Sequence, residues 1–135
     1  TTLTIPSTSE RVITVGAYDS ANISTVGFSG RGYTRATEYI KPDLVAPGVN
    51  ILTTTVGESI TSFTGTSAAT PFVSGAAALL MEWGIVDRND IFLYGERLKA
   101  FLCNGAIRDN SREYPNREWG YGRLCLKNTL DLLKK

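Results

Sequence analysis

The sequence predicts a single domain that combines short strands with helices. Apolar and β-branched residues gather in short runs bounded by turn-forming residues, which is typical of strands. Residues 67–83 are instead small or apolar on nearly every side, which is typical of a helix buried in the centre of a domain. The chain has 135 residues, 42% apolar and 20% charged, which suffices for one compact domain with a modest core.

The first predicted strand is residues 11–18, RVITVGAY, which are largely apolar and rich in β-branched side chains. Residues 20–39 are rich in Ser, Gly and Thr and indicate a loop, with a tight turn at Phe28–Gly32. We therefore expect one buried strand and then a long, irregular connection.

Two further strands and a hairpin are expected before the buried helix. Pro42 and Pro47 bracket a short apolar strand, and residues 49–55 have strand composition after a turn at Pro47–Gly48. Residues 59–63, SITSF, alternate polar and apolar side chains, which predicts an antiparallel strand that returns as a hairpin.

The buried helix over residues 67–83 has Pro71 in or near its first turn, where a missing N–H group costs least. Asn89 or Asp90 is the expected cap of a second helix. The remaining predicted elements are this second helix over 91–106, a surface loop over 108–117 and a short amphipathic helix over 124–135.

Charge and cysteine content exclude several classes of partner and site. Fourteen basic and thirteen acidic residues leave a net charge of +1, so neither nucleic acid nor an anionic membrane is an expected partner. No apolar segment was expected to be long enough to span a membrane. Cys103 and Cys125 do not form a CxxC pattern, and the chain contains no histidine. A zinc site built from cysteine and histidine ligands is therefore excluded. Free thiols are favoured, and a disulfide is the alternative.

One serine lies at a position where it could act as a nucleophile. Ser67 follows Gly65 and Thr66 at the boundary between an extended segment and the buried helix. The first-turn N–H groups of a helix have no intrahelical partner, so they can stabilise the negative oxygen that forms when a serine attacks a carbonyl. Helix capping is the alternative role, since serine is a favoured N-cap residue.

Residues 65–80, GTSAATPFVSGAAALL, closely resemble the nucleophile motif of the subtilase family. Other segments resemble further family motifs in the expected order: 12–19 (VITVGAYD), 28–32 (FSGRG), 41–48 (KPDLVAPG) and 119–124 (WGYGRL). The resemblance implies an α/β fold, namely the C-terminal half of a three-layer subtilisin-like domain with a mostly parallel sheet, a β-hairpin and a buried central helix. Residues 78–106 look most like the branch that includes the clostridial germination proteases.

By position in the motif, Ser67 would be the nucleophile of a serine endopeptidase, with its own N–H group and Thr66 supporting the oxyanion. The resemblance also implies four substrate-binding residues: Ser62, Phe63, Thr64 and Gly65. Phe63 would touch the substrate on the leaving-group side, and a core-facing strand residue is its alternative role. No metal ligand or cofactor is expected in this chain, although subtilases often bind structural calcium.

The family activates its serine with a histidine that an aspartate orients, and an asparagine completes the oxyanion hole. These three residues are expected before Thr1, and the 135 residues contain no histidine. We therefore expect residues 1–135 to be the C-terminal portion of a longer catalytic domain, inactive alone. Its expected partners are a polypeptide substrate and either the N-terminal portion or a second copy.

Two other functions remain open: a pseudoprotease scaffold with a binding or regulatory role, and an autonomous structural module. The localisation is left unassigned; secretion or spore association would follow the family. Phe72 and Ala68 depart from the histidine and methionine that are common at their positions, and Phe72 is interpreted as a packing variant. Asp19 and Asp43 lie beside turns and are expected to satisfy backbone N–H groups.

Overall fold

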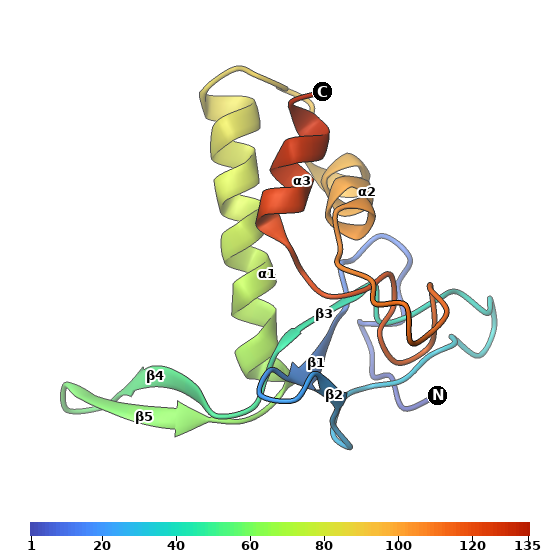
Figure 1. Ribbon diagram of the computed structural model, residues 1–135, viewed down its shortest axis with the longest axis vertical. Helices are drawn as coiled ribbons and strands as arrows, with labels where there is room; N and C mark the ends of the chain where they lie inside the picture. Colours follow the sequence, from blue (N-terminus) through green and yellow to red (C-terminus); the bar gives the residue numbers. More distant parts are fainter.

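The computed structural model describes residues 1–135 and has a mixed α/β architecture (Figure 1). The strands are β1 (Val15–Asp19), β2 (Ser24–Thr25), β3 (Leu44–Pro47), β4 (Ile51–Thr55) and β5 (Ser59–Phe63). The helices are α1 (Thr66–Met81), its five-residue π-helical continuation η1 (Glu82–Val86), α2 (Gly95–Asn104) and α3 (Leu126–Leu133). The order of elements agrees with the α/β class expected from the sequence.

Three strands form a small sheet in the order β2-β1-β3. β1 and β3 are parallel, with Val15 opposite Leu44, whereas β2 pairs antiparallel with the end of β1. The first strand begins later than predicted because Thr14 donates its N–H to the Asp43 carboxylate, 2.7 Å away, instead of to a strand partner. The carboxyl ends of β1 and β3 therefore lie at one edge of the sheet, which is where α1 begins.

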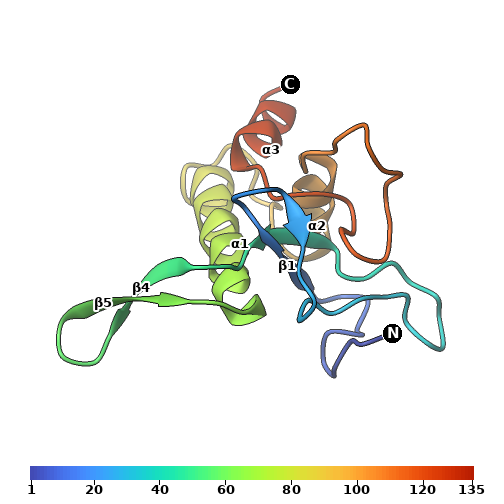
Figure 2. The same ribbon diagram turned by 60° about the horizontal axis from the view of Figure 1, so that its bottom comes forward.

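The predicted hairpin is confirmed as β4 and β5, which pair antiparallel with Ile51 opposite Phe63. It projects away from the body of the molecule in both views of the ribbon (Figures 1 and 2). Its residues are exposed except for the half-buried Ile51, and Val56 at its tip is 98% exposed. The hairpin is thus fixed to the body only at its base, next to the start of α1.

One face of α1 packs on β1 and β3 and contributes Ala69, Val73 and Leu80 to the core. The core also contains these buried residues from other elements: Ala17, Leu44, Ala46, Leu93, Leu98, Leu102 and Cys103. α1 is thus the predicted buried central helix, with one face buried within these 135 residues. Its other face leaves Phe72 43% and Leu79 54% exposed, because no element of the chain covers it.

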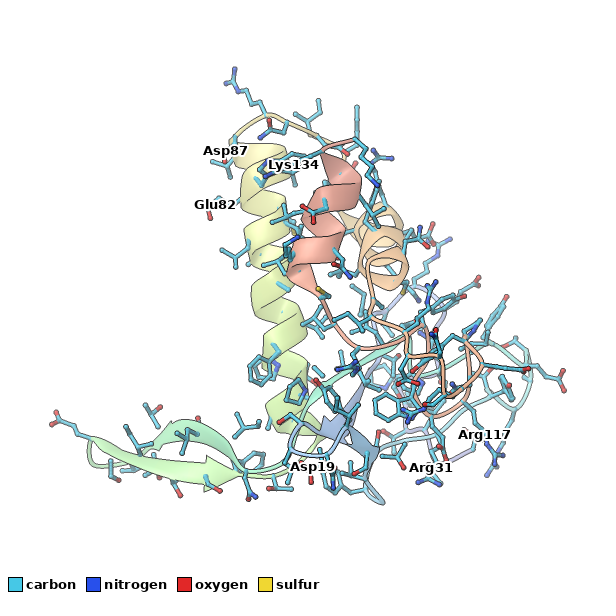
Figure 3. The ribbon with its side chains drawn as sticks, viewed as in Figure 1. Asp19, Arg31, Glu82, Asp87, Arg117 and Lys134 are labelled. Carbon is cyan, nitrogen blue, oxygen red and sulfur yellow. The ribbon has the colours of Figure 1, made fainter.

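Pro71 lies in the second turn of α1, later than predicted, so it removes the N–H group that would bond the carbonyl of Ser67. α1 and η1 together span 21 residues and are long and apolar enough to cross a membrane, although no segment of that kind was predicted from the sequence. The core helix of a domain can have this same length and composition. Figure 3 labels Glu82 and Asp87 at the end of this helix that lies farthest from the hairpin.

The second helix begins four residues later than predicted, at Gly95, with Tyr94 as its N-cap residue. Asp90 does not cap it, because its carboxylate instead accepts the Phe92 N–H and pairs with Arg97. Residues 108–117 form the predicted surface loop, apart from an isolated bridge at Asn116. The last helix is shorter than predicted, and the two cysteines are free thiols, as favoured.

Candidate active site

Ser67 is exposed in the first turn of α1, immediately after the hairpin. Gly65 is the N-cap residue, and its carbonyl accepts the Ala68 N–H at 3.0 Å. The Ser67 N–H has no intrahelical acceptor because it belongs to the first turn. An exposed hydroxyl and an available amide therefore occur in one residue, at the positive end of the helix dipole.

Backbone hydrogen bonds tie this turn to the sheet. Gly48, directly after β3, donates its N–H to the carbonyl of Tyr18 at 3.0 Å and accepts the N–H of Gly65 at 2.8 Å. Asn50 donates its N–H to the Thr64 hydroxyl at 2.9 Å. Ser67 is thus held at the carboxyl edge of the parallel strands, which is where open α/β sheets place their ligands.

A cavity of about 370 Å³ opens beside Ser67, between the base of the hairpin and the first two turns of α1. It is lined by Ile51, Leu52, Thr53, Phe63, Ser67, Ala68, Pro71 and Phe72. None of these side chains is ionisable, and Ser67 and Thr53 contribute its only side-chain hydroxyl groups. The site therefore presents a hydroxyl at the edge of an uncharged, mainly apolar hollow.

The structure brings only Phe63, of the four predicted substrate-binding residues, to the cavity beside Ser67. Ser62 points to the opposite face of β5, as strand alternation requires. Thr64 instead bonds to Asn50. Gly65 has an extended backbone, with φ 160° and ψ 167°, and is not among the residues that line the cavity. The glycine that the backbone here requires is Gly48, where a Cβ atom would lie 2.6 Å from Ala17 Cβ and 2.9 Å from the carbonyl oxygen of Gly65.

Thr66 begins α1, and its carbonyl accepts the hydroxyl of Thr70 at 2.9 Å. Its predicted role beneath the oxyanion remains a prediction. Six of the cavity residues were not predicted from the sequence: Ile51, Leu52, Thr53, Ala68, Pro71 and Phe72. Two signals could have found three of them: Ile51 lies opposite Phe63 in the hairpin, and Pro71 and Phe72 lie four residues after Ser67 and Ala68, on the same face of the helix. Phe72 therefore lines the cavity and is more than a packing residue.

The two aspartates that we assigned to backbone contacts do form them. Asp19 accepts the Ala21 N–H at 2.9 Å. Asp43 is buried away from this site, where it accepts the Thr14 N–H and pairs with Lys41 and Lys99, each 2.8 Å away. No group of cysteine, aspartate and glutamate side chains has the arrangement needed to hold a metal ion.

Comparison with known proteins identifies the class of protein that this fold and site define. The family model described as the subtilase family matches residues 1–122. The chain belongs to the subtilase family.

Individual relatives support this assignment. The serine protease AprX of Bacillus subtilis is 32% identical, over 96% of this chain and 32% of AprX. The structure of the Clostridium perfringens CspB protease superposes with a TM-score of 0.95 at 52% identity, over 99% of this chain and 29% of that one. The self-cleaved protease domain of PatA matches with a TM-score of 0.74 at 32% identity, over 96% of this chain and 44% of that one. The chain thus spans less than half the length of each of these three relatives.

Proposed function

We propose that this chain supplies the nucleophile of a serine endopeptidase. The observation that carries the proposal is the position of Ser67: its hydroxyl is exposed and its N–H lacks an intrahelical acceptor, beside a cavity that can hold a substrate side chain. The names of the relatives, which include proteases of Bacillus subtilis and Clostridium perfringens, support a polypeptide as the substrate.

In the proposed reaction, Ser67 Oγ forms a bond to the scissile carbonyl carbon while a base takes its proton. The carbonyl oxygen becomes negative and accepts the Ser67 N–H. The carbon–nitrogen bond then breaks, the leaving amine takes the proton, and the acyl group stays on Ser67 until water hydrolyses it. Phe63 flanks the leaving group in this arrangement.

A neutral serine hydroxyl is a poor nucleophile without a base, and no histidine is present in the 135 residues. We propose that the aspartate, histidine and oxyanion asparagine come from another part of the protein, so that residues 1–135 alone are inactive. The uncovered apolar face of α1, with Phe72 and Leu79, supports this arrangement, because apolar surface of this kind is stabilised by burial.

Two alternatives exist. A second copy of the chain could cover the same face of α1, or the chain could be an autonomous module that needs no partner. Light scattering and apolar-dye binding on residues 1–135 distinguish them. A monomer that binds no dye and melts cooperatively would contradict our view that this face needs a cover, whereas a dimer would favour self-association.

The test of function is labelling with a fluorophosphonate, which reacts with activated serines, followed by peptide mass spectrometry. We expect a label on Ser67 in the full-length product of the gene and none in residues 1–135 alone. Ser67→Ala is the control and removes the label. A folded full-length protein that takes no label would refute the enzyme and favour the pseudoprotease, whose hydroxyl is not activated.

A further inference from the structure

We propose that Thr64 is a positioning residue for Ser67. Its hydroxyl joins the two chains at the base of the hairpin and so fixes the direction in which the chain enters α1. This inference rests on the proposed function, because it concerns the rate at which Ser67 reacts.

The connection between the hairpin and the nucleophile helix is short. Only two residues, Thr64 and Gly65, separate β5 from α1. Both views of the ribbon show the base of the hairpin next to the start of the helix (Figures 1 and 2). Ser67 follows this connection so closely that a rotation within it would move the Ser67 hydroxyl.

The regular pairing of the hairpin ends just before this connection. Ile51 and Phe63 form the last pair of β4 and β5, and the next residues in the register are Asn50 and Thr64. Asn50 has a φ of 53°, a left-handed conformation that asparagine adopts more readily than most residues and that takes it out of the ladder. Its N–H group donates to the Thr64 hydroxyl at 2.9 Å. A side chain thus takes the place of a backbone acceptor.

Two hydrogen bonds therefore hold the connection to the chain that enters the hairpin. One joins two backbones, from the Gly65 N–H group to the Gly48 carbonyl at 2.8 Å. The other uses the Thr64 hydroxyl, so it is the one that a side-chain substitution can remove. Without it, the connection is held to that chain by the Gly65 bond alone and gains freedom to rotate.

The role of Thr64 is indirect. Its side chain is not among those that line the cavity beside Ser67. It acts through the backbone on the position of the Ser67 hydroxyl, where a displacement of about 1 Å costs roughly two orders of magnitude in rate. Loss of the Thr64 hydroxyl should therefore lower kcat, whereas loss of a substrate contact would raise KM.

The experiment uses the full-length protein with Thr64→Val, which exchanges the hydroxyl for a methyl group. We expect the rate of fluorophosphonate labelling of Ser67, and kcat on a quenched peptide, to fall by roughly tenfold or more, with KM within about twofold of wild type. Thr64→Ser keeps a hydroxyl and should restore most of the rate. Asn50 and Thr64 are exposed, so water can satisfy the N–H group in the variant and the midpoint of urea unfolding should change little.

Two further variants show whether the hydroxyl is responsible. Thr64→Ala removes the hydroxyl without adding a methyl group in its place. It should slow labelling as Thr64→Val does, and it gives a result even where Thr64→Val fails to fold. Thr61→Val is the matched control: Thr61 is exposed on the same strand, lies outside the cavity and makes no side-chain hydrogen bond, so this variant should react at the wild-type rate.

The outcomes separate this inference from the proposed function. Absence of a label on wild-type Ser67 refutes both. With a labelled wild type, three results refute the positioning role alone: Thr64→Val or Thr64→Ala reacting at the wild-type rate, Thr64→Ser reacting as slowly as Thr64→Val, or a rise in KM without a fall in kcat. An equal loss of rate in Thr61→Val, or a loss that parallels a lower urea midpoint, would also overturn it, because Thr64 would then only stabilise the hairpin.

Discussion

The N–H group of Gly65 donates a 2.8 Å hydrogen bond to the carbonyl of Gly48, which joins the end of β3 to the residue that caps the nucleophile helix. There is no room for a side chain at this junction. A Cβ atom at Gly48 would lie 2.6 Å from Ala17 Cβ and 2.9 Å from the carbonyl oxygen of Gly65. The position of Ser67 therefore depends on a glycine that lies 19 residues before it (67 − 48).

Gly48→Ala should move the turn that carries Ser67. We expect the rate of fluorophosphonate labelling of the full-length protein to fall at least tenfold, because even a displacement of about 1 Å costs roughly two orders of magnitude in such sites. Overpacking should also lower the free energy of unfolding by about 1–3 kcal/mol. Gly27→Ala is the matched control, since a Cβ there meets nothing within 4 Å. Wild-type labelling of Gly48→Ala would show that the turn tolerates the shift.

Local patterns in the sequence were sufficient to predict β1, β3, the hairpin and the position of Ser67, whereas β2 lies in the segment predicted as a loop. Alternation in residues 59–63 predicted β5, and the switch to small apolar residues after Gly65 predicted α1. These features depend on residues that are neighbours in the sequence, so they could be predicted without a structure.

Features that depend on distant contacts were not predicted. Asp90 resembles a helix cap, but its pairing with Arg97 across the turn delays α2 until Gly95. The apolar residues of α1 indicated burial, but composition does not show which face this chain covers. Predicting the cavity would have required both the register of β4 on β5 and the face of α1 that follows Ser67. Neither pattern alone predicts it.

A buried ion cluster joins three parts of the chain. The Asp43 carboxylate accepts bonds from Lys41 and Lys99, each 2.8 Å away, and from the Thr14 N–H. Lys41 is 1% exposed, and burial, partly offset by Asp43, lowers its pKa. Both ammonium groups also donate to the carbonyl of Val12. Asp43 thus compensates two charges that would otherwise be poorly solvated.

Asp43→Asn should destabilise the protein by roughly 3–5 kcal/mol, because it leaves a buried lysine without its counter-charge. Urea unfolding measures this loss. Lys127→Ala is the control: this lysine pairs with Asp131 on the exposed surface, where solvent screens the charges, so losing that pair should change the free energy of unfolding far less. Equal effects of the two variants would show that the buried cluster contributes no more than a surface pair.

Cys103 should resist alkylation in the folded protein. Burial, assisted by the charge of Asp43, raises the pKa of the Cys103 thiol to about 11. Only the thiolate reacts, so at pH 8 almost none of the reactive form is present. We expect iodoacetamide to modify Cys103 at least tenfold more slowly in the native protein than in urea, as quantified by peptide mass spectrometry. Equal rates in both states would contradict its burial.

The pairing of Asp90 with Arg97 should make the start of α2 sensitive to acid. The Arg97 guanidinium, which hydrogen bonds to the carboxylate, lowers the pKa of Asp90. Because the pKa is lower in the folded state, the unfolded state binds more protons as the pH falls. The stabilisation is therefore fully present above the unfolded pKa, about 4, and is lost as the pH drops through the folded value.

Arg97→Gln should remove this stabilisation and return the pKa of Asp90 toward its ordinary value, which NMR titration of the carboxyl carbon measures directly. Urea unfolding should show the variant less stable than wild type at pH 6, with the difference shrinking below about pH 4 as Asp90 becomes protonated in both proteins. Arg35→Gln is the control, since Arg35 is exposed and forms no salt bridge. A stability difference that persists unchanged at low pH would mean that Arg97 acts through its contact with the Phe101 ring, 5.1 Å away, and not through Asp90.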